Sequence, residues 1–409
     1  MKKDALDIIS CAIRAADPYD STKNILNELE KEVGGKLTVF SIGKAAVPMA
    51  SAAQDVFGDE IKTGLLITKY GHCGDFHSDY FEMIESAHPV SDENSILAAE
   101  RALDIAESLK ENDALIVLLS GGGSALMEKS VLSSETQREI TRKLLARGAE
   151  IDEINAIRRR ISLVKGGRLA AVAYPAKVYT VALSDVLNND KSVIASGITV
   201  REPLMKSDFE KIANKYLPEY ADEFSRILSD DVQLKINDGG FFFAGDINSL
   251  CSAAEKRAQE LGYNIADSAR SLNGEASDTA ARLVADSIKH SGKNAFVYGG
   301  ETTVTLKGSG LGGRNQEMAL RAAIELRGEK NIVFASAGSD GTDGPTDAAG
   351  GIADGETAQL MRQKGVDAVQ SLNDNDAYHA LGAVGGLLKT GATGTNVNDV
   401  TVLLLRTAE

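Results

Sequence analysis

The loop from Gly338 to Asp347 holds the densest group of side chains in this sequence that could do chemistry. It contains three carboxylates, three glycines and three hydroxyls, and it directly follows the apolar run 332–335. A buried strand that ends in such a loop is the usual place for a ligand in an α/β sheet. The carboxylates could hold a hard cation, and the glycines would let backbone N–H groups approach an anion. A solvated turn has the same composition, so this loop alone leaves both interpretations open.

A second loop places Lys44 just after the apolar run 37–42, at the expected start of a helix. A lysine beside the free N–H groups of a helix start favours anion binding. The loop differs from a Walker A motif, because Thr38 stands at the first glycine position and Ala45 at the Ser/Thr position. A merely solvated lysine is the alternative.

A third loop, Ser120 to Ala125, follows the run 115–119 and contains three consecutive glycines. Flanked by serines, they can form a nest of N–H donors for phosphate or carboxylate, although a flexible turn has the same composition. The GxGxxG spacing is missing, which weakens a nicotinamide-dinucleotide interpretation. Ser124 lacks the Gly-x-Ser-x-Gly pattern and a triad histidine, so the sequence does not support it as a nucleophile.

A basic patch then interrupts the acidic sequence, with Asn155, Arg158 and Lys165 among its polar residues. Such a run is usually a solvated helix face. The interleaved Ile157 and Ile161 indicate instead a partly buried helix with some cations facing a cleft.

Two loops further along the chain offer acidic candidates. Asp185 follows a strand expected at 178–183, where a base or a metal ligand would reach a cleft, although a helix cap or turn explains it as well. Glu301 and Thr302 fall in a glycine turn that is most simply a plain hairpin.

Arg314, flanked by glycines and followed by Asn315, could bind a planar carboxylate or phosphate through two hydrogen bonds, unless the loop is simply mobile. The polar stretch 390–399 fits a connection as well as a site. Together the loops supply what phosphoryl transfer needs: cations, glycine nests, and aspartates for Mg²⁺ or a base.

Alternating elements must position these loops. The expected strands are 37–42, 65–67, 115–119 and 178–183, and the expected helices are 4–16, 44–56, 96–109 and 140–146. Strands that alternate with helices indicate βαβ units, so we expect an N-terminal three-layer α/β/α domain with a mostly parallel, Rossmann-like sheet.

A second α/β domain is expected after a polar, helical connection at 201–235. Its expected strands are 295–298, 302–306, 332–335 and 400–405. The first two are close enough to form a hairpin, which predicts a mixed sheet. The expected domains are therefore 1–235 and 236–409.

Composition excludes several classes of function. The chain has 409 residues and a net charge of −15, which favours two domains and argues against nucleic-acid and anionic-membrane binding. The three cysteines form no CxxC pair, so a reducing cytoplasm is the simplest compartment. The sequence has neither a signal-peptide pattern nor an apolar stretch of about 18 residues, so no membrane span is expected.

Nine short motifs recur in a known order between residues 40 and 405. They are 41–44, 119–125, 154–158, 164–170, 196–199, 299–304, 312–317, 338–347 and 393–399. Together they resemble the glycerate 2-kinases of the two-domain type, whose C-terminal part is called the MOFRL domain.

The resemblance implies ATP-dependent, Mg²⁺-requiring phosphorylation of D-glycerate at the 2-hydroxyl, giving 2-phosphoglycerate and ADP, in a cleft between domains that close. It implies that Lys44 binds the transferred phosphate, that Arg314 reaches the glycerate carboxylate or the phosphates, and that Asp185 orients or deprotonates the hydroxyl. The remaining substrate- and phosphate-binding residues are Ser120, Gly121, Gly122, Gly123, Ser124, Asn155, Arg158, Lys165, Glu301, Thr302 and Asn315; Asp340 and Asp343 are the metal ligands. We expect ATP and D-glycerate as partners, no nucleic acid or membrane, and allow for a homodimer.

The sequence departs from the family pattern at Leu187, Asn188 and Asn189, where Pro-Gly-Asp is common, and at Ile198, where proline is common. The first departure changes the loop geometry and leaves Asp185 as the one residue of this loop that is a candidate base or metal ligand. The alternatives are an NAD(P)H-dependent hydroxypyruvate reductase and a non-catalytic sugar-phosphate sensor. The residues themselves leave the choice between the 2- and 3-hydroxyl open.

Overall fold

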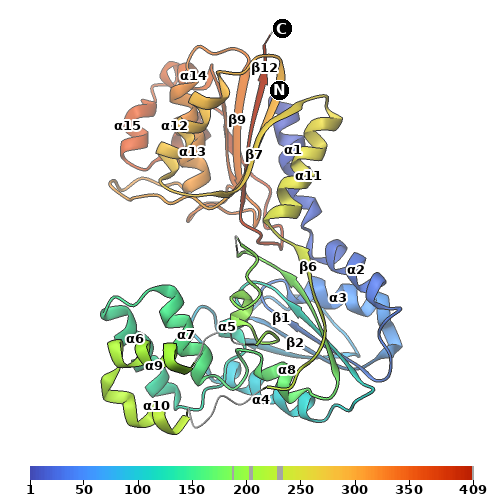
Figure 1. Ribbon diagram of the computed structural model, residues 1–409. Coiled ribbons are helices and arrows are strands. Elements are labelled where there is room, and N and C mark those ends of the chain that lie inside the picture. Colours follow the sequence, from blue (N-terminus) through green and yellow to red (C-terminus); the bar gives the residue numbers. More distant parts are fainter. Residues whose placement is uncertain (187, 202–205, 228–233, 408–409) are drawn as a thin grey trace. The chain divides into compact units, whose positions relative to one another are not determined.

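The computed structural model describes residues 1–186, 188–201, 206–227 and 234–407, which form two compact units (Figure 1). The parallel-sheet unit comprises 22–182 and 190–244, and the mixed-sheet unit comprises 1–21, 183–189 and 245–409. This division differs from the expected linear one, because the N-terminal helix and the loop that carries Asp185 belong with the C-terminal residues.

The parallel-sheet unit is built on a six-stranded sheet in the order β3-β2-β1-β4-β5-β6. The strands are β1 (Leu37–Ile42), β2 (Ile61–Lys69), β3 (Phe81–Ser86), β4 (Ala114–Leu119), β5 (Lys177–Leu183) and β6 (Asn237–Gly245). Strands β1 to β5 pair in parallel, with Ile42 opposite Leu119. Connections run outward in both directions from β1 and β4, so the topological switch point, where such sheets bind ligands, lies between these two strands.

Helices connect these strands. They are α2 (Pro18–Leu29), α3 (Ala46–Phe57), α4 (Glu93–Glu107), α5 (Gly123–Leu126), α6 (Ser134–Ala146), α7 (Ile151–Ile161), α8 (Arg168–Val172), α9 (Lys206–Tyr216) and α10 (Ala221–Ile227), with 3₁₀ turns η1 (Gly58–Glu60), η2 (Ile194–Ser196) and η3 (Pro218–Tyr220). Asp92 caps α4 by accepting the backbone N–H of Ser95. Helices α6, α7, α9 and α10 share a separate apolar core that includes Ile157 and Phe209.

The mixed-sheet unit contains strands in the order β11-β10-β9-β12-β8-β7. They are β7 (Asn264–Leu272), β8 (Lys293–Gly300), β9 (Ile332–Gly338), β10 (Gly350–Asp354), β11 (Leu387–Leu388) and β12 (Asp399–Arg406). Strand β12 is antiparallel to β8 and β9, whereas β7 is parallel to β8. The expected α/β class, with one parallel and one mixed sheet, is confirmed.

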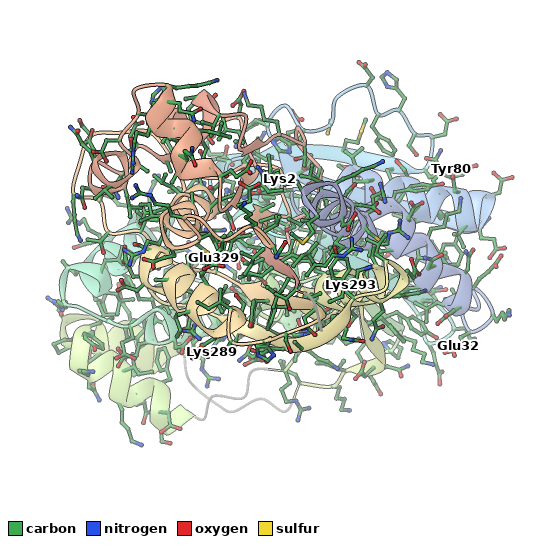
Figure 2. All side chains as sticks on the ribbon, turned by 90° about the horizontal axis from the view of Figure 1, so that it is seen from above. Lys2, Glu32, Tyr80, Lys289, Lys293 and Glu329 are labelled. Carbon is green, nitrogen blue, oxygen red and sulfur yellow. The ribbon has the colours of Figure 1, made fainter. Side chains whose placement is uncertain are left out.

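Helices lie on and around this mixed sheet. They are α1 (Lys2–Ala15), α11 (Ile247–Glu260), α12 (Ala276–Ser287), α13 (Arg314–Glu325), α14 (Thr357–Gln363), α15 (Ala368–Asn373) and α16 (Ala377–Ala383). Helices α1 and α11 lie on one face and α12 and α13 on the other (Figure 1). Polar contacts hold α1 in place: Lys2 Nζ, labelled in Figure 2, lies 2.9 Å from Asp354 Oδ2, and Asp7 pairs with Arg257.

The hairpin predicted for 295–298 and 302–306 is wrong. Strand β8 ends at Gly300, and 302–306 form only an isolated bridge at Thr303. Thr305 instead donates its backbone N–H and its hydroxyl to the carboxylate of Glu275, at 2.9 and 3.0 Å. The sheet is nevertheless mixed, because β12 is antiparallel to β8 and β9 and β10 is antiparallel to β9.

Among the residues that the structure describes, no helix is both long and apolar enough to cross a bilayer.

Candidate active site

The two phosphate-binding loops predicted from the sequence meet at the switch point of the parallel sheet. The backbone N–H of Lys44 donates to the carbonyl of Gly121 at 2.9 Å, and that of Ala45 donates to Ser120 Oγ at 3.0 Å. The contact requires a glycine at position 43, where φ is +130° and a methyl group would lie 2.1 Å from Ser120 Oγ. Helix α3 begins only at Ala46. The amides of Lys44 and Ala45 are already hydrogen-bonded within the protein, so they are not free to bind an anion.

The free donors lie instead in the glycine loop. Across the described chain, the N–H groups of residues 121–124 donate to no protein acceptor. Gly122 has φ +91°, the left-handed geometry that turns successive N–H groups toward one point. The Lys44 ammonium is exposed and has no carboxylate partner among the described residues. Lys44 and the glycine loop therefore bring together a cation and free N–H donors, the groups that binding a phosphate or carboxylate would need.

Ser124 is held by a residue that sequence reasoning did not assign to the site. Its hydroxyl lies 2.6 Å from that of Ser196. Ser196 and Ala195 have φ of +58° and +47°, a region that costs non-glycine residues energy. The motif 196–199 was the available signal, but nothing in it predicts this contact.

Asn155 and Arg158 lie one turn apart on α7. Their face of the helix adjoins the face with which Ile157 packs into the core shared by α6, α7, α9 and α10. Both are half-buried, and neither side chain has a hydrogen-bonding or ionic partner within the described ranges. Burial lowers the pKa of Arg158. A half-buried guanidinium without a counter-charge is costly, which favours an anionic ligand at this place.

Lys165 has a different environment from the other predicted ligands. Its side chain is fully buried and forms an ion pair with Glu128, which also accepts a hydrogen bond from Ser162 Oγ at 2.9 Å. Burial acts to lower the pKa of Lys165, and the adjacent carboxylate offsets the lost hydration. This geometry favours a structural role for Lys165.

Single replacements of this pair should destabilise the protein strongly. Lys165→Met or Glu128→Gln alone is expected to lower the free energy of unfolding by about 3–5 kcal/mol, because each leaves one buried charge without its partner. The double variant should recover most of the loss, which denaturant unfolding measures. A stable double variant with normal kcat/KM would establish the structural role; a stable double variant that binds substrate at least tenfold more weakly would instead make Lys165 a ligand.

In the mixed-sheet unit, Arg314 is the first residue of α13 and donates through Nε and Nη2 to Asp399, at 2.5 and 2.9 Å. Nη2 also lies 2.7 Å from Glu301 Oε1. Burial acts to lower the pKa of Arg314, but these carboxylates outweigh it and raise the pKa. Burial raises the pKa of Asp399 to about 6, although Arg314 acts to lower it. Nη1 is the guanidinium nitrogen that keeps no partner in the described structure.

Asp399 was not predicted as a site residue. The loop that carries Asp185 lies beside it, although the sequence analysis assigned that loop to the other domain. Asp399 lies opposite both Gly300 and Gly338 in the sheet register, so three predicted loops meet around it. Its neighbour Asn398 donates to the backbone carbonyl of Asp185 at 2.9 Å. The structure thus brings the predicted catalytic residues Asp185 and Arg314 to one edge of this unit. Leu187, part of the departure from the family pattern, lies outside the described residues.

Three further predicted residues of this unit, Thr302, Asn315 and Asp343, are buried, whereas Asp340 is half-buried. Thr302 Oγ1 lies 3.6 Å from the Met318 sulfur, and Asn315 accepts a hydrogen bond from Ser336 at 2.5 Å. The carboxylate of Asp343 accepts the N–H groups of Asn315 and Gln316 at 3.2 and 2.8 Å and so caps α13. Burial raises the pKa of Asp343, against these hydrogen bonds. These side chains hold Arg314 in place rather than face an open surface.

Asp343→Ala should therefore act on stability. We expect the free energy of unfolding to fall by about 2–3 kcal/mol, because buried amides lose their acceptor. Asp340→Ala is the matched control in the same loop: Asp340 accepts only the N–H of Thr342 through its side chain, at 2.9 Å, so its loss should change stability by less than about 0.5 kcal/mol. Equal effects of the two replacements would contradict the capping role.

The same contacts bear on Mg²⁺. Both oxygens of Asp343 accept amide hydrogens, which disfavours this side chain as a metal ligand relative to Asp340. Asp340 keeps one oxygen that accepts no hydrogen bond from a described residue. In the part of the chain that the structure describes, no three His, Cys, Asp or Glu residues form a preformed metal cluster.

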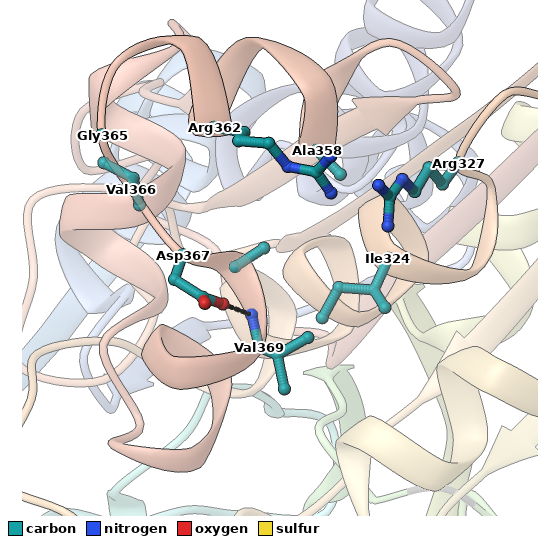
Figure 3. Close-up of a pocket in the computed structure, with 9 residues that line it drawn as sticks. Ile324, Arg327, Ala358, Arg362, Gly365, Val366, Asp367 and Val369 are labelled. Carbon is teal, nitrogen blue, oxygen red and sulfur yellow. Dashed lines mark hydrogen bonds between the residues drawn. The ribbon is translucent and has the colours of Figure 1, made fainter.

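One hollow of about 300 Å³ lies within the mixed-sheet unit, where α13 ends and α14 and α15 meet, at the end of α13 opposite Arg314. In Figure 3 the guanidinium groups of Arg327 and Arg362 point toward one another at its edge, near Ile324. It holds none of the predicted residues and does not lie at the strand ends, so it is distinct from the candidate active site.

The chain is similar to known proteins over nearly its whole length. Residues 4–229 match a family described as a domain of unknown function (DUF4147), and residues 294–399 match the MOFRL family. The D-glycerate 2-kinase of Thermotoga maritima is 41% identical over 415 residues, covering 99% of this chain and 98% of that protein. The glycerate 2-kinase of Pyrococcus horikoshii is 38% identical over 433 residues, covering 98% and 96%. The crystal structure of a glycerate kinase from Thermotoga maritima superposes with a TM-score of 0.94 at 40% identity, covering 99% of each chain.

Proposed function

Because this chain belongs to the glycerate 2-kinase family, we propose that it transfers the γ-phosphoryl group of ATP to the 2-hydroxyl of D-glycerate, giving 2-phosphoglycerate and ADP. One observation supports this chemistry above the others: four consecutive N–H groups without acceptors lie beside Lys44 at the switch point of the parallel sheet. Fixed donors and a mobile positive charge are what a transferring phosphoryl group needs.

The predicted residues then divide between the phosphates and the glycerate carboxylate. Lys44 and the amides of residues 121–124 bind phosphate oxygens and stabilise the charge that develops on them. Asn155 and Arg158 bind the glycerate carboxylate, because Arg158 is the half-buried guanidinium without a counter-charge. Arg314, whose orientation Asp399 fixes, adds positive charge through Nη1.

In the proposed phosphoryl transfer, Asp185 acts as the base. The 2-hydroxyl oxygen forms a bond to the γ-phosphorus, the bond from that phosphorus to the bridging oxygen of ADP breaks, and the hydroxyl proton passes to the Asp185 carboxylate. Asp185 is exposed, and Asn398 fixes its loop through the backbone carbonyl.

We propose that Mg²⁺ arrives with ATP, held mainly by the phosphates, with Asp340 as the protein ligand. The ion would neutralise phosphate charge. This assignment drops Asp343, whose oxygens are engaged in the helix cap.

Phosphorus NMR of the reaction with Mg-ATP and D-glycerate tests the proposal. We expect a 2-phosphoglycerate resonance together with an equal amount of ADP. A 3-phosphoglycerate signal would overturn the regiochemistry, and an unchanged ATP spectrum would overturn the kinase activity. Consumption of NADH with hydroxypyruvate, run in parallel, would support the reductase instead.

Arg158→Gln should weaken glycerate binding selectively. We expect the KM for D-glycerate to rise by about tenfold or more while the KM for ATP stays within twofold, because one charge-assisted contact is lost. Steady-state kinetics with each substrate varied measures both values. Arg138→Gln, on an exposed position of α6, is the control. A rise in the KM for ATP alone would move Arg158 to the nucleotide.

A further inference from the structure

His88 lies shortly after β3, with its ring against the glycine loop. A methyl group at Gly122 would lie 3.1 Å from His88 Cδ2 and 3.3 Å from Nε2, so the ring edge that carries Nε2 faces this loop. The other four histidines of the chain are exposed, whereas His88 is half-buried. The sequence offered no motif that would assign His88 a role.

The ring nitrogens of His88 have no hydrogen-bond partner in the described structure. Neither nitrogen is among the buried polar atoms that lack a partner, so the ring nitrogens are open to water or to a ligand. The ring edge lies against Gly122, within the loop whose N–H groups at residues 121–124 are free, so ring and loop could share one ligand.

The charged groups that face His88 are cations. Burial lowers the pKa of His88, and the charges of Lys44 and Lys69 lower it further. Lys69 is the last residue of β2, and Lys44 follows β1. The imidazole is therefore neutral at pH 7, and an anion placed among these groups would raise its pKa again.

We propose that His88 is a further phosphate-binding residue, which donates a hydrogen bond from Nε2 to an oxygen of the phosphate held by the glycine loop and Lys44. The inference rests on the proposed function, which assigns the phosphate to that loop. It carries a consequence of its own: because the anion favours the protonated ring, anion binding is coupled to proton uptake by His88 at pH values between the pKa of the free ring and that of the anion-bound ring.

Histidine NMR with sulfate as the probe tests this, because sulfate does not titrate near neutral pH. In the free protein the His88 ring should titrate below about 6.5, and saturating sulfate should raise that midpoint by about half a pH unit or more. Loss of one ring signal in His88→Gln assigns the resonance. Backbone amide signals of residues 121–124 should shift with the same sulfate affinity.

Two variants separate the hydrogen bond from the charge. His88→Gln keeps an N–H donor near the Nε2 position, so its sulfate affinity at pH 7.5 should stay within about threefold, whereas His88→Leu should lose about tenfold. His290→Gln, on an exposed histidine, should change neither value.

If sulfate shifts the amide signals of residues 121–124 but leaves the titration midpoint of His88 unchanged, the role of His88 is overturned and the anion site at the glycine loop stands. Sulfate that shifts neither would overturn the anion site itself. Product formation in the phosphorus NMR assay reports on the kinase proposal independently of both outcomes.

Discussion

Lys44→Ala is expected to lower kcat/KM by on the order of 10²-fold or more, because it removes a charge that stabilises the transferring phosphoryl group in the transition state. The fold should be unaffected, since the ammonium is exposed and has no carboxylate partner among the described residues. Steady-state kinetics with ATP and D-glycerate measures the first expectation, and thermal unfolding measures the second.

Lys31→Ala is the matched control for Lys44, because Lys31 is also exposed and lies in the same unit. It should leave both kcat/KM and the melting temperature unchanged. Normal kinetics of Lys44→Ala would show that the transferred phosphate does not bind at Lys44. The phosphate-binding role proposed for the adjacent residues 121–124 would then be contradicted as well. A larger loss in kcat than in 1/KM would place the charge in the transition state rather than in ground-state binding.

Arg314→Ala should lower kcat/KM by a similar factor, on the order of 10²-fold, and should also destabilise the protein. The second effect follows because Asp399 is buried and would lose its bidentate partner. We expect a loss of about 3 kcal/mol in the free energy of unfolding, at the lower end for a buried pair because Arg314 itself is partly exposed. Kinetics and denaturant unfolding on the same variant measure both.

Arg257 provides the control for Arg314, since it also pairs with two carboxylates of the same unit, Asp7 and Glu260. Its partners are much more exposed than Asp399, so Arg257→Ala should cost about 1 kcal/mol or less and leave kcat/KM unchanged. An Arg314→Ala variant that loses stability but keeps its kinetics would show that the arginine only supports the fold. Arg314→Lys should recover the charge but not the two-point contact with Asp399.

Local sequence patterns were enough to predict most of the sheet framework. The continuous apolar runs 37–42, 115–119, 332–335 and 400–405 all fall within strands of the structure. Runs of this length form buried strands largely through their own composition, whatever lies next to them. The positions of Lys44 and the glycine loop at strand ends follow from the same runs. A local signal failed at 302–306, where the β-prone residues bond to Glu275 instead of to a strand.

The sequence by itself therefore determined the α/β class, the loops that carry charge, and through its motifs the family. Only the tertiary structure decided which of those charges are already paired. Arg314 meets Asp399, Lys165 meets Glu128, and Arg158 meets no carboxylate of the described chain. These choices depend on strand order and on loops that bring distant residues together, as when β12 enters between β8 and β9 and carries Asp399 to Arg314. Propensity and spacing act over a few residues and do not encode such pairings.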